Sequence, residues 1–449
     1  MNLHIEQNTR RLKAVSVFTG AGGLDIGFEA AGFQTLVSIE KDPDARATIE
    51  LNRQEWGLLD EGDVLRIQPD TVLAKAGCVP REVDVLIGGP PCQPFSKSAF
   101  WTRGDTRRLG DPRAGTIGAM MDLAEALLPR AIVIENVRGI AYRKKDEALH
   151  LVRRRLRAIN KAHGTSYRTS ISYLHATEFG VPQIRERAFI VALRDGGTFR
   201  NPLSTNARSP EANGGRLPPC PRAWDALAGL MPTPEDEINL RLSGKWAGLI
   251  PSIPEGANYL WHTERRGGLP LFGWRTRYWS FLLKLAKHLP SWTIQAEPGP
   301  ATGPFHWENR LLSVAEMARI QTFPAGWRFA GDYRSARRQI GNAVPAALGE
   351  AVARRLRSVL LHEPYDRALT LAMKRRSDLP AANSPTKVMP AYLSLIGRHR
   401  AHPGHGKGPG ALRASSTAPS ADLPKNRRER THAVPVDLVI EKRPAAKVA

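Results

Sequence analysis

Short apolar runs, bounded by glycine, proline or acidic residues, recur along the chain up to about residue 195. Their length and their content of Val and Ile predict buried strands. These runs lie at 14–18, 35–39, 83–87 and 131–134. Segments with helical spacing, at 119–128 and 147–161, alternate with them. Strands that alternate with helices are typical of a parallel sheet covered on both faces. The pattern therefore predicts an α/β fold with a doubly wound, mostly parallel sheet.

The alternation stops near Asp195, where the composition changes to Pro, Gly and Asn with scattered Trp and Arg. This change predicts a smaller, irregular second domain that extends to about Phe305. A helix is expected at 313–321, because Ser313 and Glu316 have the spacing of a capping box.

An apolar helix is expected at 346–361, and beyond about Pro364 the chain is rich in Pro, Ala, Ser and Arg without periodicity. Such a composition predicts a basic, largely disordered tail. The expected divisions of the chain are therefore 12–194, 195–305, 306–363 and 364–449.

Positive charge is in excess, with 65 Lys and Arg against 43 Asp and Glu, a net charge of +22. Residues 371–449 contain 15 basic and 5 acidic residues, so the body of the chain is basic as well. Such a charge favours a nucleic-acid partner, although charge alone does not separate DNA from RNA or from a need for solubility.

No apolar run is long enough to cross a membrane, and the first residues lack the layout of a signal peptide. Cys78, Cys92 and Cys220 are far apart and show no spacing for zinc or for a disulfide framework. We therefore expect a cytoplasmic protein in a reducing compartment, with no bound metal.

A glycine-rich loop follows the first predicted strand and contains Gly20, Gly22 and Gly23. Glycines there let a backbone approach a ligand closely, but the spacing is not that of the dinucleotide-binding or phosphate-binding loops. Glu40 ends the second strand, where a carboxylate can accept the hydroxyls of a ribose, although it could also be a solvated acid. Asp63, at the end of a third candidate strand, could reach an adenine amino group. A nucleoside without a phosphate is the ligand that this pattern favours.

Cys92 follows a strand that ends in glycines and prolines, so it would lie at the edge of the sheet where ligands bind. This position suits a nucleophile, and the alternative is a small buried apolar residue. Glu135 ends another strand on the same edge and is a candidate general acid, or else a helix cap.

Alternation at 180–187 predicts a strand with Gln183, Arg185 and Arg187 on one face. Three donors on one face suit a base edge or phosphate oxygens, and the alternative is a solvated face with ordinary ion pairs. Asn342, before the last apolar helix, could cap that helix or contact a ligand. The Trp and Arg residues at 261–268 and 274–279 could contact bases or phosphates, or build a small core.

Five motifs follow one another along about residues 14–360. They are Phe18-Thr19-Gly20-Ala21-Gly22-Gly23, Pro90-Pro91-Cys92-Gln93, Glu135-Asn136-Val137, Gln183-Ile184-Arg185-Glu186-Arg187 and Gln339-Ile340-Gly341-Asn342-Ala343-Val344-Pro345. In this order the chain resembles the DNA cytosine-5 methyltransferases, in particular the bacterial enzymes of restriction-modification systems. The resemblance implies a class I methyltransferase fold and S-adenosylmethionine as the cofactor.

The resemblance also implies a role for each matching residue. Cys92 would add to carbon 6 of cytosine, Glu135 would hold a proton at N3, and Arg185 would orient the base. The residues implied at the cofactor are Phe18, Gly20, Gly22, Gly23, Glu40, Asp63, Pro90, Asn342 and Val344. Residues 195–305 would recognise the target sequence, and residues 306–363 would complete the catalytic domain. The residues expected on DNA are Gln93, Ser96, Arg187, Arg265, Arg266, Arg275 and Arg277.

The implied partners are double-stranded DNA and a cognate restriction endonuclease that acts separately, and the enzyme is expected to be a monomer. Three alternatives stay open at this point. Methyltransferases that act on amino groups generally carry an acidic or polar residue, two prolines and an aromatic ring where this chain has Gly89-Pro90-Pro91-Cys92. A transfer-RNA cytosine methyltransferase is disfavoured by the long arginine-bearing region, and a silent DNA-binding relative is disfavoured by Cys92 and Glu135.

Overall fold

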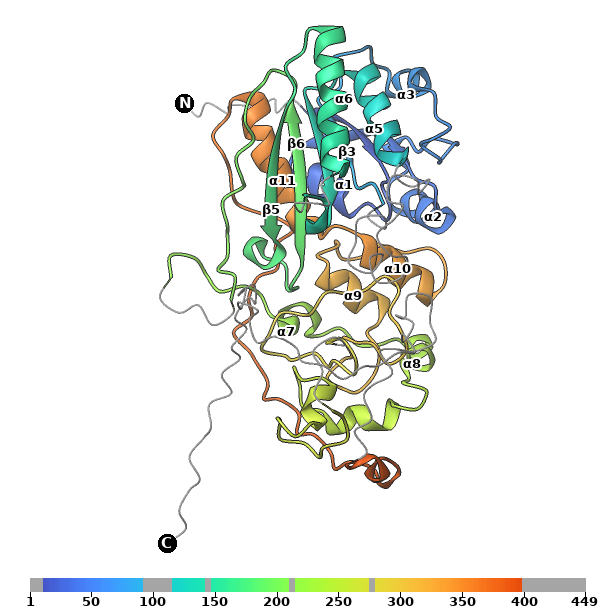
Figure 1. Ribbon diagram of the computed structural model, residues 1–449, viewed down its shortest axis with the longest axis vertical. Helices are drawn as coiled ribbons and strands as arrows, with labels where there is room; N and C mark the ends of the chain where they lie inside the picture. Colours follow the sequence, from blue (N-terminus) through green and yellow to red (C-terminus); the bar gives the residue numbers. More distant parts are fainter. Residues whose placement is uncertain (1–10, 92–114, 142–146, 210–214, 274–278, 398–449) are drawn as a thin grey trace, which may run out of the picture. The chain divides into compact units, whose positions relative to one another are not determined.

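The computed structural model describes residues 11–91, 115–141, 147–209, 215–273 and 279–397 (Figure 1). The predicted site residues Cys92, Gln93, Ser96, Arg275 and Arg277 lie outside the described residues, as does the chain after residue 397. No helix in the described ranges is long and apolar enough to cross a membrane.

Within the described residues, one six-stranded sheet organises the amino-terminal part of the chain (Figure 1). Its strands are β1 (Leu12–Val17), β2 (Phe33–Ile39), β3 (Val85–Gly88), β4 (Ala131–Asn136), β5 (Arg168–His175) and β6 (Glu186–Leu193). The strand order is β2-β1-β3-β4-β6-β5; β1 to β4 are parallel, and β6 is antiparallel to both of its neighbours. The predicted α/β fold with a mostly parallel sheet is confirmed.

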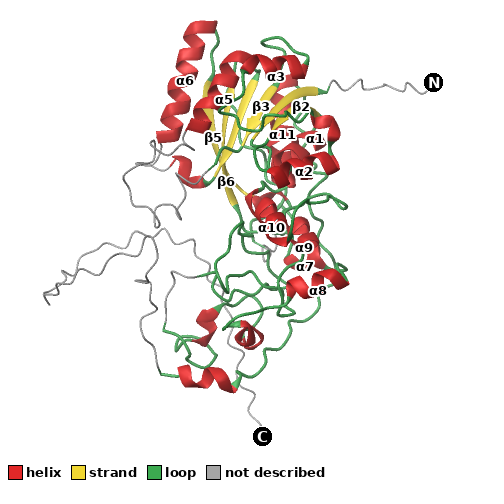
Figure 2. Ribbon diagram, turned by 90° about the vertical axis from the view of Figure 1, so that its right-hand side faces the viewer, coloured by secondary structure: helices red, strands yellow, loops and turns green. Residues whose placement is uncertain are grey.

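Helices cover both faces of this sheet (Figures 1 and 2). On one face lie α1 (Gly23–Ala30) and α11 (Ala346–Leu361), and on the other lie α3 (Pro69–Ala76), α5 (Gly115–Leu127) and α6 (Glu147–His163). In β3, Val85 and Ile87 pack toward the first group and Leu86 toward the second. Because both faces are covered, most residues of the parallel strands are buried, which explains the short apolar runs in the sequence.

The third strand expected to end at Asp63 does not form. Residues 58–63 are a loop after α2 (Pro43–Asn52) and the short turn Gln54–Trp56, and the loop pairs with β2 through an isolated bridge between Ser38 and Leu58. A Cβ at Gly62 would lie 2.0 Å from the carbonyl oxygen of Glu40, so the glycine permits the close approach of loop and strand. Acidic residues interrupt the apolar residues of the segment 58–63, which is too short to form a strand.

Asn342 precedes α11 as expected, but it is the last residue of another helix and does not cap α11, whose N-cap residue is Pro345. The helix α10 (Tyr333–Asn342) begins after Asp332, whose side chain accepts a hydrogen bond from the backbone amide of Ser335. A short turn then leads to α11. The sequence of α10 is mostly polar, so apolar periodicity did not reveal this helix.

The strand expected at 180–187 is present only at its end, because β6 begins at Glu186. Gln183 forms an isolated bridge with Ser291, and both Gln183 and Arg185 are buried. The alternation of polar residues therefore does not mark a solvated face, since the chain around Ser291 covers this segment.

The region after β6 contains the short helices α7 (Ala223–Leu227) and α8 (Pro234–Leu240) and the turns Ala247–Ser252 and Tyr259–His262. Its small core includes Leu249, Ile253, Leu282 and Phe305. Trp246 packs against Phe272 and Phe281 with ring centroids 5.3 and 5.8 Å apart. At least this tryptophan builds a core, which is the alternative that the sequence left open for such residues.

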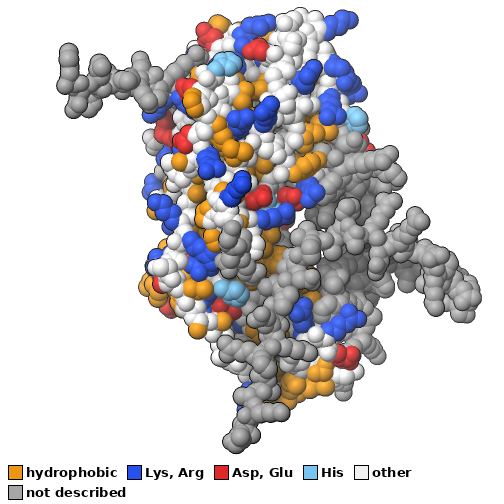
Figure 3. All heavy atoms as spheres, turned by 90° about the vertical axis from the view of Figure 1, so that its left-hand side faces the viewer, with side chains coloured by type: hydrophobic (Ala, Val, Ile, Leu, Met, Phe, Trp, Pro, Cys, Tyr) orange, Lys and Arg blue, Asp and Glu red, His pale blue; other side chains and the backbone are white. Residues whose placement is uncertain are grey.

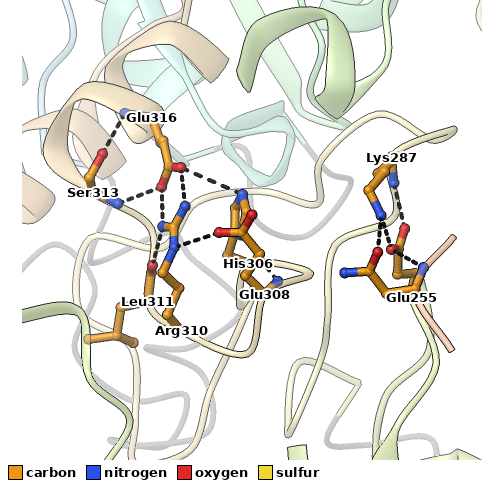
Figure 4. A network of polar contacts seen from close by, with 9 residues as sticks. Glu255, Lys287, His306, Glu308, Arg310, Leu311, Ser313 and Glu316 are labelled. Atoms are coloured by element: carbon orange, nitrogen blue, oxygen red, sulfur yellow. Dashed lines mark hydrogen bonds and ion pairs between the residues drawn. The ribbon is translucent and has the colours of Figure 1, made fainter. Parts of the chain in front are cut away.

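The helix α9 (Val314–Ile320) begins with the predicted capping box. The Ser313 hydroxyl accepts from the amide of Glu316, and the Glu316 carboxylate accepts from the amide of Ser313. Arg310 also donates to both carboxylate oxygens of Glu316, at 2.7 and 2.8 Å (Figure 4). These contacts connect α9 firmly to the segment that precedes it.

Residues 364–397, which we call the C-terminal strap, lie on the folded body and include the short turn Pro390–Leu395 (orange to red in Figure 1). This finding differs from the disorder expected beyond Pro364. Leu371 and Ala372 pack against the core beside α11, and Tyr392 is buried in the core of the irregular region. The strap is extended and held by a few separate contacts, so its sequence has no period to detect.

Basic side chains are spread over the face of the molecule shown in Figure 3, where acidic side chains are fewer. The positive charge counted in the sequence is therefore displayed on the folded body, where it favours the approach of a polyanion.

Candidate active site

A cavity of about 630 Å³ lies at the carboxyl ends of β1 to β4, the edge at which open α/β sheets bind ligands. The turn between α10 and α11 closes one side of it. The predicted site residues that line it are Phe18, Gly20, Gly23, Glu40, Asp63, Pro90, Glu135, Arg185, Arg187, Asn342 and Val344. The structure thus brings the expected cofactor residues and the expected acid together.

Two glycines of the loop after β1 have different roles. A Cβ at Gly23 would lie 2.3 Å from the carbonyl oxygen of Val344, so this glycine lets the distant turn close the cavity. Gly22 is not part of the described cavity wall. It has a φ of 84°, and a Cβ there would lie 2.7 Å from the ring of Trp56. Gly22 therefore lets the loop pack closely against the side chain of Trp56.

Glu40 is held by backbone amides at the end of β2. Gly20 donates to one carboxylate oxygen at 2.6 Å, and Asp42 donates to the other at 2.7 Å. Burial raises the pKa of Glu40, and these hydrogen bonds offset part of the rise. Each oxygen has a second lone pair, so the carboxylate can still accept two hydroxyl groups.

Asp63 also lines the cavity and pairs with Lys41, with 2.7 Å between the ammonium nitrogen and a carboxylate oxygen. This hydrogen bond lowers the pKa of Asp63. Asp63 is therefore ionised at neutral pH and can accept a hydrogen bond from a ligand, even though it comes from a loop and not from a strand.

Glu135, at the end of β4, forms an ion pair with Arg187 of β6, with 2.7 Å between Oε1 and Nε. Burial raises the pKa of Glu135, and the charges of Arg187 and Arg185 partly offset that rise. A carboxyl group with a raised pKa holds its proton closer to neutral pH, which suits a proton donor. Arg187, expected on DNA, thus lies beside the expected acid.

Arg185 is buried and donates to the backbone from the cavity wall. Its Nη2 donates to the carbonyl oxygen of Gly341 at 2.6 Å, and its Nη1 donates to that of Ile294 at 3.3 Å. The guanidinium therefore links the sheet to two later segments while it faces the cavity.

Two residues of this site were not among the predicted ones. Asn136 donates to the carbonyl oxygen of Pro90 at 3.0 Å and so supports the turn that precedes Cys92. Asp25 is fully buried in α1 and lines the cavity. An acid between Leu24 and Ile26, at the start of an apolar helix, was the signal that could have revealed it.

Arg265 and Arg266 are the described residues of the irregular region that were predicted to contact DNA, and neither lines this cavity. Arg265 and Arg266 are exposed in a turn that wraps around Trp261. A Cβ at Gly267 would lie 2.7 Å from the Trp261 ring, so the aromatic side chain supports the turn.

A sequence model of the family described as C-5 cytosine-specific DNA methylase matches residues 12–358. The chain belongs to this family. Type II methyltransferase M.SacI of Streptomyces achromogenes is 38% identical to it over an alignment of 370 residues that covers 77% of this chain and 92% of that protein. Type II methyltransferase M.NgoFVII of Neisseria gonorrhoeae is 30% identical over 347 residues, 76% of this chain and 85% of that protein.

Solved structures show the same fold as this DNA cytosine-5 methyltransferase. A putative DNA modification methyltransferase encoded within an E. coli prophage aligns with a TM-score of 0.56 and 20% identity, over 78% of this chain and 100% of that chain. The S. pombe Dnmt2 methyltransferase aligns with a TM-score of 0.51 and 17% identity, over 78% and 99%.

The methyltransferase uses S-adenosylmethionine as its methyl donor. The residues present in the cavity fit this cofactor. Glu40 retains acceptor capacity for ribose hydroxyls, and Asp63, which also lines the cavity, can accept a hydrogen bond from an amino group.

Proposed function

We propose that this cavity is the active site at which the protein methylates carbon 5 of a cytosine in a specific sequence of double-stranded DNA. The observation that supports the proposal is the convergence of Glu40, Glu135 and Asn342 on one cavity beside Pro90 and Pro91, which directly precede Cys92. In this assignment Glu40 binds the ribose of the cofactor and Asp63 the adenine. Phe18, Gly20, Pro90 and Val344 surround them.

Cys92 is the nucleophile in the proposed mechanism. Its thiolate adds to carbon 6 of the cytosine while Glu135 gives a proton to N3, so that carbon 5 becomes nucleophilic. The bound cofactor supplies the methyl group to carbon 5. Loss of the carbon-5 proton and release of Cys92 then restore the ring.

The arginines of the cavity position these groups. Arg187 holds the Glu135 carboxyl group, and Arg185 orients the base and stabilises charge at its O2. Carbon 6 is hidden in a stacked duplex, so the base must be flipped into the cavity, at a cost of about a few kcal/mol that DNA contacts offset.

Residues 195–305 select the DNA sequence in this proposal, since this is the long stretch that lacks the shared motifs. We further propose that the protein acts in the cytoplasm as a monomer and protects host DNA from a separate cognate endonuclease. The type II names of its relatives support this role.

The covalent mechanism is tested with duplex DNA that contains 5-fluorocytosine. Fluorine does not leave as a proton does, so the wild-type protein should form an adduct that survives denaturation and maps to Cys92. Cys92→Ser should bind DNA, form no adduct and transfer no methyl group, because a hydroxyl is a far weaker nucleophile at neutral pH. More than a few per cent of the wild-type rate in this variant would refute the mechanism.

Methyl transfer from labelled cofactor to duplex DNA and to transfer RNA distinguishes the two possible substrates. Transfer to duplex DNA and not to transfer RNA is expected, and bisulfite sequencing of DNA from cells that express the protein would identify the methylated sequence. Methylation of transfer RNA alone would overturn the proposed substrate.

A further inference from the structure

The C-terminal strap is fixed at its start to the catalytic part of the chain. Leu371 packs in the apolar core beside α11, and the amide of Met373 donates to the carbonyl oxygen of Gly180 at 2.8 Å. A Cβ at Gly180 would lie 2.5 Å from the side chain of Ala372, so the strap and this loop are in close contact. The loop continues to Arg185 in the cavity wall. The strap therefore begins on a segment that carries a residue of the active site.

The next contact of the strap is with α7. Asp225 and Arg222 form a buried ion pair. The carboxylate of Asp225 accepts from the amide of Arg376 at 2.9 Å, and the guanidinium of Arg222 donates to the carbonyl oxygen of Arg376 at 2.7 Å. The backbone of the strap is thus held by both members of the pair. Since α7 shares one apolar core with α9 and α10, this second anchor also belongs to the catalytic part.

The far end of the strap belongs to the irregular region. Glu255 accepts from the amide of Asn383 at 2.8 Å, and Lys287, which pairs with Glu255, donates to the side-chain oxygen of Asn383 at 2.9 Å (Figure 4). The ring of Tyr392 stacks on that of Trp246, with centroids 6.1 Å apart and 15° between the planes. Tyr392 is therefore part of the core of the irregular region.

The irregular region depends on such contacts for its shape. Among its described residues from 241 to 305, the regular elements are the short turns Ala247–Ser252 and Tyr259–His262. Segments with little regular hydrogen bonding are held by their tertiary contacts and open more easily than core strands and helices. A strap that is attached at both ends limits such movement, because the short chain between Arg376 and Asn383 has a fixed maximum length.

Recognition and methylation have to take place on the same duplex. The irregular region has to contact the target sequence while the cavity holds the flipped cytosine of that sequence. A displacement of about 1 Å between groups that act together can reduce a rate by about 100-fold. The strap follows residues 12–358, which the family model matches, so this connection is additional to the shared motifs.

We propose that the C-terminal strap holds the irregular region in register with the cavity and so determines how selectively the protein methylates its DNA sequence. Its positioning residues are Arg376, Asn383 and Tyr392. The inference rests on the proposed function, in which residues 195–305 select the sequence and the cavity methylates it.

The test inserts a flexible linker of about eight Gly and Ser residues between Leu379 and Pro380. Both residues are exposed and lie between the anchors at Arg376 and Asn383, so every anchor stays in the chain. On the duplex sequence that the wild type methylates, we expect kcat/KM to fall by about ten- to one-hundred-fold. The preference over sites with one changed base pair should fall by about tenfold. The same linker after Gly397 is the matched control and should change neither quantity.

Two further measurements separate positioning from a general role in folding. The insertion variant should keep the wild-type affinity for S-adenosylhomocysteine, measured by isothermal titration calorimetry, and the wild-type thermal midpoint. Asn383→Ala removes one side-chain contact of Lys287 and should lower the selectivity in the same direction by a smaller factor. This second variant decides the question if the insertion variant does not fold.

Unchanged kcat/KM and selectivity in both variants would overturn the inference. A loss of cofactor affinity that matches the loss of methyl transfer would also overturn it, because the strap would then support the whole fold. If the wild type methylated no duplex DNA, the proposed function itself would be wrong, and this inference with it.

Discussion

Buried carboxylates are used in opposite ways in the cavity and along the C-terminal strap. In the cavity, Glu40 and Glu135 keep acceptor capacity on the side that faces the ligand space. Under the strap, the carboxylate of Glu350 in α11 accepts from Arg354, from the amide and hydroxyl of Thr370 and from the amide of Leu371, all within 2.9 Å.

The strap meets the irregular region through carboxylates of the same kind. Asp225 accepts from the amide of Arg376 at 2.9 Å, and Glu255 accepts from the amide of Asn383 at 2.8 Å. Glu255 also pairs with Lys287, whose ammonium group donates to Asn383 at 2.9 Å (Figure 4).

A structural carboxylate is saturated by donors of the chain itself, whereas a carboxylate available for chemistry is not. A saturated carboxylate contributes to stability, because its removal leaves several buried donors unpaired. A carboxylate with vacant lone pairs is available to a ligand. Neutralising the first kind should cost stability, and neutralising the second kind should cost catalysis.

The largest effect is expected for Glu135→Gln. Loss of a proton donor typically costs about 10²- to 10⁴-fold in rate, and we expect kcat to fall by that factor. Stability should change less than at Glu350, because Gln keeps an acceptor for Arg187. Single-turnover methyl transfer and a thermal melt measure the two quantities, and a large loss of stability with little loss of rate would contradict the comparison.

Glu350→Gln should show the reverse behaviour. The amide cannot satisfy all the donors that converge on this fully buried group, so we expect a loss of about 2–4 kcal/mol in stability and a lower thermal midpoint. The rate at 25 °C should remain near that of the wild type. Asp378→Asn, on the exposed part of the strap, is the control and should leave the thermal midpoint unchanged.

Arg265→Ala and Arg266→Ala test whether these two arginines of the irregular region contact base edges or phosphates. An arginine that contacts a guanine edge contributes about 1–3 kcal/mol of discrimination, so its removal should relax the preference at one position of the methylated sequence. An arginine on phosphate should weaken all sequences alike. Methylation of a library of randomised sites distinguishes these results, and an unchanged profile in both variants would exclude these arginines from recognition.

Arg187→Gln should change the pH dependence of the reaction. Without the positive charge that lowers it, the pKa of Glu135 rises further, and its carboxyl group stays protonated to higher pH. The limb of the kcat–pH profile that reports loss of this proton should therefore shift to higher pH. Arg138→Gln, which breaks a more exposed pair with Glu186, is the control and should not shift the profile.

The smallest effect is expected from truncation after Gly397. The removed residues contain 11 basic and 4 acidic residues. They should add affinity through counterion release, so truncation should reduce the salt dependence of DNA binding without changing the methylated site or the thermal midpoint. A changed site would assign sequence recognition to these residues.

The sequence alone determined the sheet, the order of the motifs and the edge at which the site lies. Apolar runs report burial on both faces, and glycines or acids directly after a strand come to lie at its carboxyl end. For this reason the positions of Glu40 and Glu135 at the carboxyl edge of the sheet follow from the sequence.

Tertiary structure alone decided what these residues touch. The pairing of Arg187 with Glu135, the closure of Val344 over Gly23 and the attachment of the strap to Glu350 join segments that are distant in the sequence. Such contacts leave no local period, because each depends on the partner that the fold brings to it. Asp25 likewise reads as one acid in a helix until the fold buries it beside an open cavity.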